Sequence, residues 1–231
     1  VNPEPLAPFF DIILLGDGEN LIPNFVESIK KVQGLSRTEK LEYLATIPGI
    51  YIPSLYTPKY TKEGELRAID ANRPQIPKAI TKQTWQGNVL SQSSVITPDS
   101  AWPNIHMVEV VRSCPELCRF CMASYLTLPF RTSSIDNALI PAIRMGFQYT
   151  NRIGLLGASI TQHPEFEDLL NYLEHDEFED MRLSLSSVRA GTVNKKMTNL
   201  LNKRGSKSIT IAIESGSDKM RKIVNKKLSE E

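Results

Sequence analysis

The chain has 231 residues, of which 41% are hydrophobic and 23% are charged, a composition typical of globular proteins. Its formal net charge of +1 gives no overall attraction to nucleic acid, and no apolar run is long enough to span a membrane. Three clustered cysteines without a secretory signal predict a cytoplasmic protein. Because the first residue is valine and the last residues continue a helical pattern, we expect a fragment of a longer protein.

Residues 1–48 predict a proline-rich loop, a strand, a glycine turn and helices. The apolar run 10–15 is typical of a buried parallel strand, and the apolar residues of 21–32 recur at helical spacing. A strand, turn and helix in this order are expected at the end of an open α/β sheet. A second short helix is expected over residues 36–45.

Residues 49–103 predict an extended connector between two domains, because they are polar and proline-containing and show little periodicity. Residues 104–231 then alternate between short apolar strands and amphipathic helices, which predicts an α/β domain. The expected strands are 105–111, 152–156, 182–186 and 208–213, and the expected helices are 134–145, 164–175, 193–203 and one from Asp218. Four successive β/α units imply a parallel sheet whose strand-end loops share one rim.

All three cysteines, Cys114, Cys118 and Cys121, fall in the loop after the first of these strands. Thiolates are metal ligands, and three in one loop can hold one centre. A disulfide framework would leave one cysteine over. A structural zinc site usually needs four protein ligands, and the nearest histidine, His106, lies on the preceding strand. A cubane iron–sulfur cluster with three cysteines would leave one iron open for a small molecule.

The Cys-x3-Cys-x2-Cys arrangement, with Phe120 directly before the last cysteine, resembles the signature of the radical SAM superfamily. In that family the open iron of a [4Fe-4S] cluster is chelated by S-adenosyl-L-methionine (SAM), and reductive cleavage of SAM generates a 5′-deoxyadenosyl radical. The resemblance implies a radical SAM-type partial (β/α) barrel, of which this chain has about four β/α units. It also implies an electron donor such as flavodoxin or ferredoxin.

The resemblance assigns candidate SAM contacts to the other rim loops. Gly157, Ala158 and Ser159 stand where the family commonly has Gly-Gly-Glu at the SAM amino group, and a simple tight turn is the alternative. Arg189 could bind the SAM carboxylate or be a surface arginine. Ser187 could hold the same carboxylate or cap the turn.

The fourth rim loop carries Glu214 and Ser215, in a Glu-Ser-Gly-Ser sequence that resembles the family motif near the SAM ribose and methionine. Glu214 could instead form a salt bridge, and Ser217 could cap the last helix. No residue is assigned to the chemistry on the substrate, which the sequence does not identify.

The stretch 2–11, followed by Gly-Asp-Gly-Glu, resembles the closing segment of the flavodoxin-like cobalamin-binding domain that precedes many radical SAM domains. The residues that ligate cobalt in such a domain would lie upstream of Val1. This resemblance implies cobalamin-dependent methyl transfer as an outcome of the radical chemistry.

Two other functions stay open. One is a radical SAM enzyme that modifies tRNA or a ribosomal protein, because residues 195–227 hold ten Lys or Arg against Glu214 and Asp218. Solvated helix faces explain that excess more simply. The other is a zinc or iron–sulfur binding module without catalysis.

Overall fold

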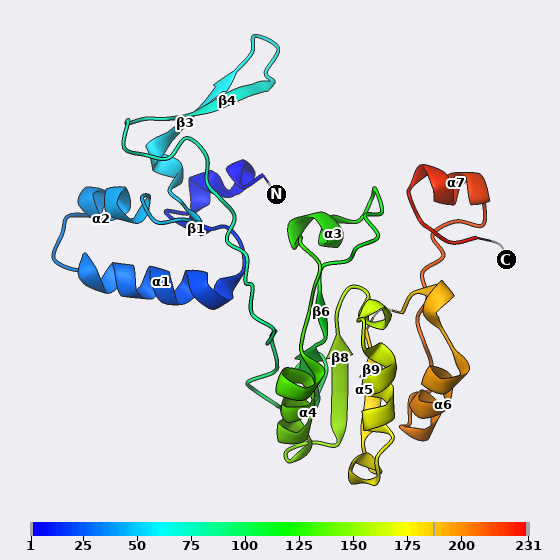
Figure 1. Ribbon diagram of the computed structural model, residues 1–231. Helices are drawn as coiled ribbons and strands as arrows, with labels where there is room; N and C mark the ends of the chain where they lie inside the picture. The colour runs from blue at the N-terminus through cyan, green and yellow to red at the C-terminus, as the bar shows by residue number, and fades with distance from the viewer. Residues whose placement is uncertain (1, 187, 230–231) are drawn as a thin grey trace. The chain divides into compact units, whose positions relative to one another are not determined.

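The computed structural model describes residues 2–186 and 188–229, and the chain divides between Gln86 and Gly87 into two compact units. The division falls inside the stretch expected to be a connector. Figure 1 shows the elements of both units, each of which has a hydrophobic core of its own.

The N-terminal unit contains short helices and two small antiparallel sheets. Its elements are η1 (Glu4–Phe9), β1 (Ile13–Leu14), α1 (Gly18–Lys31), α2 (Arg37–Leu44), β2 (Ile50–Tyr51), η2 (Pro53–Leu55), β3 (Tyr56–Tyr60) and β4 (Leu66–Ala71). Strand β1 pairs with β2, and β3 pairs with β4. The run 10–15 therefore does not form the expected parallel strand, since its partner β2 comes from the following stretch and runs antiparallel to it.

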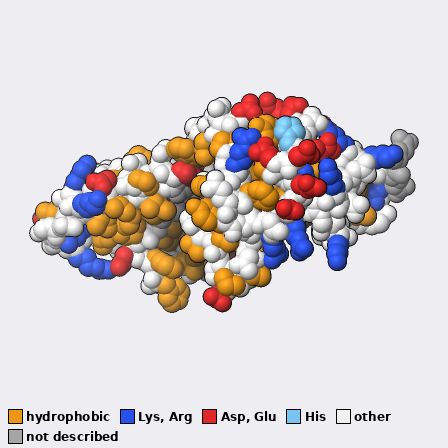
Figure 2. Space-filling view, turned by 90° about the horizontal axis from the view of Figure 1, so that it is seen from below, with side chains coloured by type: hydrophobic (Ala, Val, Ile, Leu, Met, Phe, Trp, Pro, Cys, Tyr) orange, Lys and Arg blue, Asp and Glu red, His pale blue; other side chains and the backbone are white. Residues whose placement is uncertain are grey.

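Helix α1 forms over the expected stretch but buries only part of its apolar stripe. Leu21 and the C-cap residue Val32 are buried, whereas Ile22, Val26 and Ile29 are 54%, 43% and 37% exposed. Figure 2 shows hydrophobic side chains at the surface over this helix, at the left of the view. Helix α2 begins at a capping box between Ser36 and Glu39, in which each side chain accepts a backbone N–H of the other residue.

The second unit is built around a parallel sheet of order β5-β8-β9, which confirms the α/β class. Its strands are β5 (His106–Glu109), β6 (Val111–Arg112), β7 (Arg131–Thr132), β8 (Arg152–Leu156) and β9 (Arg182–Leu185). Its helices are α3 (Met122–Leu126), η3 (Ile135–Leu139), α4 (Ile140–Phe147), η4 (Ile160–Gln162), α5 (Phe166–Leu173), η5 (Asp176–Phe178), η6 (Ala190–Thr192), α6 (Lys195–Lys203) and α7 (Asp218–Ile223). None of the described helices is long and apolar enough to cross a membrane.

Side chains at the helix starts and along their buried faces explain these helices. Ser134, Asn194 and Ser217 are N-caps whose side chains accept a backbone N–H of the first turn. The amphipathic helix expected over residues 164–175 is confirmed as α5, whose Phe166, Leu169, Leu170 and Leu173 are all buried.

The expected strand 208–213 is not formed as a strand. Only Ile211 makes a single parallel bridge, to Val188, and Ile211 and Ile213 are 39% and 52% exposed. A segment at the edge of a sheet is hydrogen-bonded on one side only, so less holds it in a regular strand. The segment nevertheless lies parallel to its neighbour at Val188, which brings the loop after it to the same rim.

Candidate functional site

A cavity of about 190 Å³ lies where the loops after β6, β8 and β9 meet the segments that flank α7. It is lined by Cys114, Glu116, Cys118, Phe120, Cys121, Ser124, Ala158, Ser159, Val188, Arg189, Ala212, Glu214, Lys226 and Lys227. The loops meet because the strands of a parallel sheet release their chains at one edge. This edge was the expected rim.

The three cysteines are free thiols, with Cys118 buried and Cys114 and Cys121 half-buried. Burial raises the pKa of Cys118, and the charge of Lys226 opposes this rise. Burial also raises the pKa of Cys114, although hydrogen bonds with Ser124 and Ser159 act in the other direction. Binding of a metal centre would therefore have to displace thiol protons.

In the part of the chain that the structure describes, the thiols of the cysteine loop do not form a site for a single metal ion with nearby side chains. Among the described residues, no three His, Cys, Asp or Glu side chains lie close enough to hold a single metal ion. The three cysteines nevertheless line the same cavity.

The cysteine loop contains two non-glycine residues with left-handed backbone conformation, Ser113 (φ 72°) and Leu117 (φ 52°). Such conformations cost about 1–2 kcal/mol for residues other than glycine, so neighbouring groups must hold them. The Ser113 hydroxyl donates to the carbonyl of Ser124 (3.0 Å), and the Tyr125 hydroxyl donates to the carbonyl of Leu117 (2.9 Å).

Glu116, between the first two cysteines, connects this loop to the rest of the rim. Its carboxylate pairs with Arg189, accepts a hydrogen bond from the Gln162 amide (2.6 Å) and lies 3.5 Å from Lys227 Nζ. The Arg189 guanidinium also donates to the carbonyl of Lys227. Arg189, expected to contact a carboxylate of a ligand, therefore has a protein carboxylate as its partner.

The loop after β8 can hold only glycine at position 157. A Cβ on Gly157 would lie 2.5 Å from Val111 Cγ2 and 2.8 Å from the Val111 carbonyl oxygen. The Ser186 hydroxyl, which sequence reasoning missed, accepts from the Gly157 N–H (3.1 Å) and donates to its carbonyl (2.9 Å). Ala158 and the buried Ser159 line the cysteine cavity, whereas Gly157 lines a neighbouring one.

The fourth rim loop places Glu214 at the cavity and Ser215 outside the set of lining residues. Glu214 has a left-handed backbone (φ 70°), and its carboxylate accepts from Lys226 Nζ at 3.2 Å. The Ser215 hydroxyl accepts from the N–H of Ser217 (3.1 Å). Ser187 lies outside the described residues.

The structure therefore gathers most of the sequence-predicted site residues around one cavity: Cys114, Cys118, Cys121, Phe120, Ala158, Ser159, Arg189 and Glu214. Sequence reasoning did not select Glu116, Ser124, Lys226 and Lys227 as site residues, although they also line the cavity. Glu116 could have been found from its place between two cysteines. The two lysines gave no signal beyond their part in a basic segment.

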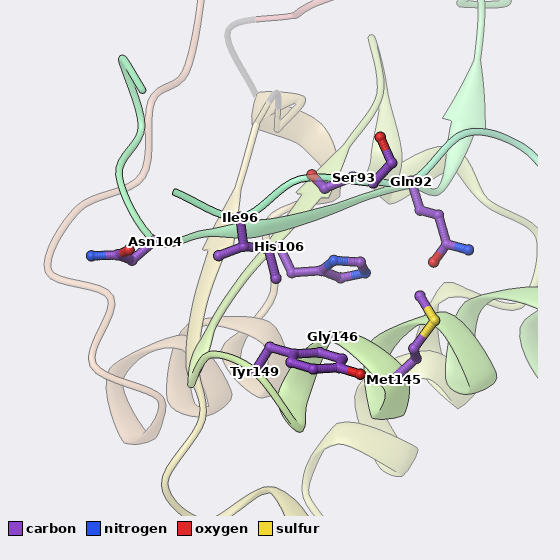
Figure 3. A pocket seen from close by; sticks show the side chains of 9 residues that line it. Gln92, Ser93, Ile96, Asn104, His106, Met145, Gly146 and Tyr149 are labelled. Carbon is purple, nitrogen blue, oxygen red and sulfur yellow. The ribbon is translucent and has the colours of Figure 1, made fainter. Parts of the chain in front are cut away.

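His106 lies in a different cavity, of about 720 Å³, and does not line the cysteine cavity. Figure 3 shows its ring between the segment that carries Gln92 and Ser93 and the end of α4 at Gly146. The side chain is only 1% exposed, and its Nε2 has no hydrogen-bond partner. The structure therefore does not make His106 a ligand beside the three cysteines.

Comparison with known proteins gives two family matches and one relative. Residues 108–231, more than half of the chain, match the family described as the radical SAM superfamily, and residues 1–53 match one described as radical SAM proteins, N-terminal. An uncharacterized protein of Methanocaldococcus jannaschii is 26% identical over 232 residues, which cover 98% of this chain and 43% of the relative. The chain thus spans less than half the length of that curated relative.

Proposed function

Because the chain belongs to the radical SAM superfamily, a superfamily of enzymes, we propose that Cys114, Cys118 and Cys121 bind a [4Fe-4S] cluster and that SAM binds beside it. When bound and reduced by an external one-electron donor, the cluster would supply one electron to SAM, whose bond between the sulfonium sulfur and C5′ would break to give methionine and a 5′-deoxyadenosyl radical. The observation that carries this proposal is that the three cysteines share one cavity with residues from three other segments of the rim.

The charges around the cavity fit a cluster that is held by three thiolates. Three thiolates bring negative charge, which nearby cations stabilise. Lys226 acts on the Cys118 thiol in this direction, because its charge favours the thiolate. Arg189 acts similarly on Cys114. Phe120 and Ala212 add apolar surface to the same cavity.

Binding of SAM would require a change of partner at Arg189. The cavity of about 190 Å³ is smaller than the roughly 300–1,000 Å³ of typical small-molecule sites. Two of its lining cations, Arg189 and Lys227, are paired with Glu116. We propose that the carboxylate of SAM replaces Glu116 at the Arg189 guanidinium, which can bind a carboxylate through two parallel hydrogen bonds.

Ser159 and Glu214 are proposed to contact the remaining polar groups of SAM. The Ser159 hydroxyl and nearby carbonyls can accept hydrogen bonds from the SAM ammonium group. Glu214 can accept from ribose hydroxyls if its carboxylate leaves Lys226 Nζ, 3.2 Å away. Gly157 and Ser186 support this side of the cavity through the two hydrogen bonds that join them.

The proposal is tested by anaerobic reconstitution with iron and sulfide, followed by reduction in the presence of SAM. We expect about four irons per chain, a brown chromophore and release of 5′-deoxyadenosine. Cys118→Ala should lose both the cluster and this product. A Cys118→Ala protein that still assembles the cubane and cleaves SAM would contradict the proposal. Iron and sulfide without 5′-deoxyadenosine would instead indicate a binding module.

The methyl-transfer prediction has no added support. The family that matches residues 1–53 is described as the N-terminal part of radical SAM proteins, without mention of cobalamin. Cobalamin therefore stays a prediction from resemblance, and reconstitution of the full-length protein with a corrinoid would test it. The substrate and the electron donor also remain to be identified by experiment.

A further inference from the structure

The turn that follows α7 is hydrogen-bonded to the cysteine loop, although the two segments are more than a hundred residues apart in sequence. The Asn225 side-chain amide donates to the carbonyls of Glu116 (3.1 Å) and Leu117 (2.9 Å). Both carbonyls lie between Cys114 and Cys118, so one amide group fixes the backbone between two of the cysteines.

Arg119 adds two contacts on the other side of Cys118. Its backbone N–H donates to the carbonyl of Val224 (2.9 Å), and its guanidinium donates to the carbonyl of Ile223. The residues from 223 to 225 therefore bond to the loop both before and after Cys118.

These hydrogen bonds lie at the part of the cysteine loop that has an unfavourable backbone conformation. Leu117 has a left-handed backbone, which is unfavourable for a leucine and persists only where its surroundings hold it. The Leu117 carbonyl accepts from both Asn225 and the Tyr125 hydroxyl. Asn225 itself has a left-handed backbone (φ 56°), which asparagine and aspartate tolerate better than most residues.

We propose that Asn225 is a positioning residue that holds the cysteine loop in the conformation able to bind one cluster. Asn225 does not line the cysteine cavity, so it acts through the carbonyls of Glu116 and Leu117. The inference rests on the proposed function, because it concerns the cluster that the three thiols would hold. It adds a residue from the α7 turn, outside the cysteine motif, to the determinants of cluster binding.

Two substitutions separate the amide group from the backbone conformation. Asn225→Asp keeps the size and the left-handed tendency, but a carboxylate has no N–H to donate to the two carbonyls. Asn225→Gly also allows the left-handed backbone and removes the side chain without adding a charge. Asn104 offers a matched control, since its backbone is also left-handed (φ 54°) and it lines the other cavity.

The experiment compares N225D, N225G, N104D and N104G with the wild-type protein. In metal-free protein, we expect the Arg119 amide to exchange its hydrogen about tenfold faster in both Asn225 variants, because the bonds to Asn225 no longer hold the loop. At limiting iron, we expect cluster occupancy to fall about tenfold, as for other groups that orient metal ligands. The paramagnetic resonance spectrum of the residual reduced cluster should broaden, while both Asn104 variants should behave as wild type.

The readouts distinguish failure of this inference from failure of the proposed function. If the Asn225 variants exchange and load the cluster as wild type does, Asn225 is not a positioning residue. Faster exchange with full cluster loading and an unchanged spectrum would also overturn the inference and leave the proposed function intact. If the wild type binds no cluster, the proposed function and the positioning role fail together, and the exchange data report only loop stability. Urea unfolding of the metal-free variants checks that each is folded.

Discussion

At the residue scale, Gly146 and His106 fit so closely that no side chain can replace the glycine hydrogen. A Cβ on Gly146 would lie 2.1 Å from His106 Cδ2 and 2.3 Å from Cγ. The His106 residue is only 1% exposed. We expect Gly146→Ala to lower the free energy of unfolding by about 1–3 kcal/mol, as overpacking does, measured by urea denaturation.

A double substitution tests whether the His106 ring causes the cost of Gly146→Ala. In a His106→Ala background the ring atoms at 2.1 and 2.3 Å are absent and only the Cβ of residue 106, at 2.8 Å, stays close, so Gly146→Ala should cost less there than in the wild type. Gly191→Ala is a control in the same unit, because no atom lies within 4 Å of a Cβ at that position. An equal cost of Gly146→Ala in both backgrounds would show that the His106 ring is not the obstacle.

His106 also makes stability depend on pH. Burial lowers the pKa of His106 below its ordinary value, although a hydrogen bond with the backbone of Ala142 acts the other way. The unfolded chain therefore takes up this proton first as the pH falls below about 6.5, and the stability that His106 contributes is lost on acidification. We expect stability to fall less between pH 7 and pH 5 in His106→Leu than in the wild type, by urea denaturation at both values. If the stability of His106→Leu falls as much between pH 7 and pH 5 as that of the wild type, His106 is not a cause of the pH dependence.

At the scale of elements, Arg204 connects the end of α6 to the end of α5. Its guanidinium donates to the carbonyls of Leu173 (2.8 and 3.1 Å) and His175 (3.1 Å), and the side chain is 1% exposed. The Leu173 carbonyl is at the last residue of α5, where no helical partner remains for it, whereas the His175 carbonyl also accepts from the N–H of Phe178 (3.0 Å). We expect Arg204→Ala to cost roughly 2–4 kcal/mol of stability, because it removes a buried side chain and leaves the Leu173 carbonyl without its two hydrogen bonds.

An exposed arginine gives the comparison. Arg144 pairs with Glu177 at 2.9 Å, but its side chain is 48% exposed, so Arg144→Ala should cost about 0–1 kcal/mol. Arg204→Lys keeps the charge but loses the planar guanidinium group that donates several hydrogen bonds. Its cost in stability should therefore lie between those of Arg204→Ala and Arg144→Ala. Similar costs for Arg204→Ala and Arg144→Ala in urea denaturation would refute the role of Arg204.

The elements that the sequence predicted well are those with local signals. The stripe of α5 and the N-cap at Ser217 are set by neighbours within one or two turns, so periodicity and capping reveal them. The pairing of β1 with β2 joins residues far apart in the sequence, as in Ile13 with Tyr51, 38 positions away, and no local pattern encodes it. The same reason explains why 208–213 could not be recognised as an edge segment.

The candidate site was also predictable in part: the meeting of its loops could be expected from the sequence, but the partners of its side chains could not. The cysteine spacing and the β/α alternation were enough to expect that the thiols and rim loops would meet. The partners of these groups were not predictable, because Glu116 reaches Arg189 and Glu214 reaches Lys226 only in the folded chain. Ser215 does not line the cavity and accepts from the N–H of Ser217, so its contact with SAM stays a prediction.

At the scale of the molecule, at least half of the ten Lys and Arg side chains of residues 195–227 pair with carboxylates among the described residues. Lys196 pairs with Glu167 (3.3 Å), Lys222 with Asp218 (2.7 Å), and Lys226 and Lys227 with carboxylates at the cysteine cavity. Figure 2 shows Lys and Arg interspersed with Asp and Glu on the face that it draws. Paired cations attract phosphates less, which favours the interpretation of this segment as solvated helix faces over a nucleic-acid patch.

The two units have separate cores, and this predicts that each can lose stability without the other. Ile50 lies in the core of the N-terminal unit and Leu155 in that of the second, and both are 0% exposed. Replacement of a buried Ile or Leu by Ala costs about 2–5 kcal/mol, through lost burial and the cavity that is left. Ile50→Ala should therefore speed hydrogen exchange in β2 and leave β8 unchanged, and Leu155→Ala should do the reverse.

Hydrogen exchange followed by mass spectrometry resolves the two units in one experiment, because peptides that contain β2 and β8 are measured side by side. In the double variant, each unit should show the rate of its own single variant, since substitutions without shared partners add independently. If Ile50→Ala instead accelerates exchange in β8 as strongly as in β2, the chain unfolds as one cooperative unit. In that case the boundary between Gln86 and Gly87 would divide two compact regions that are not independent in stability.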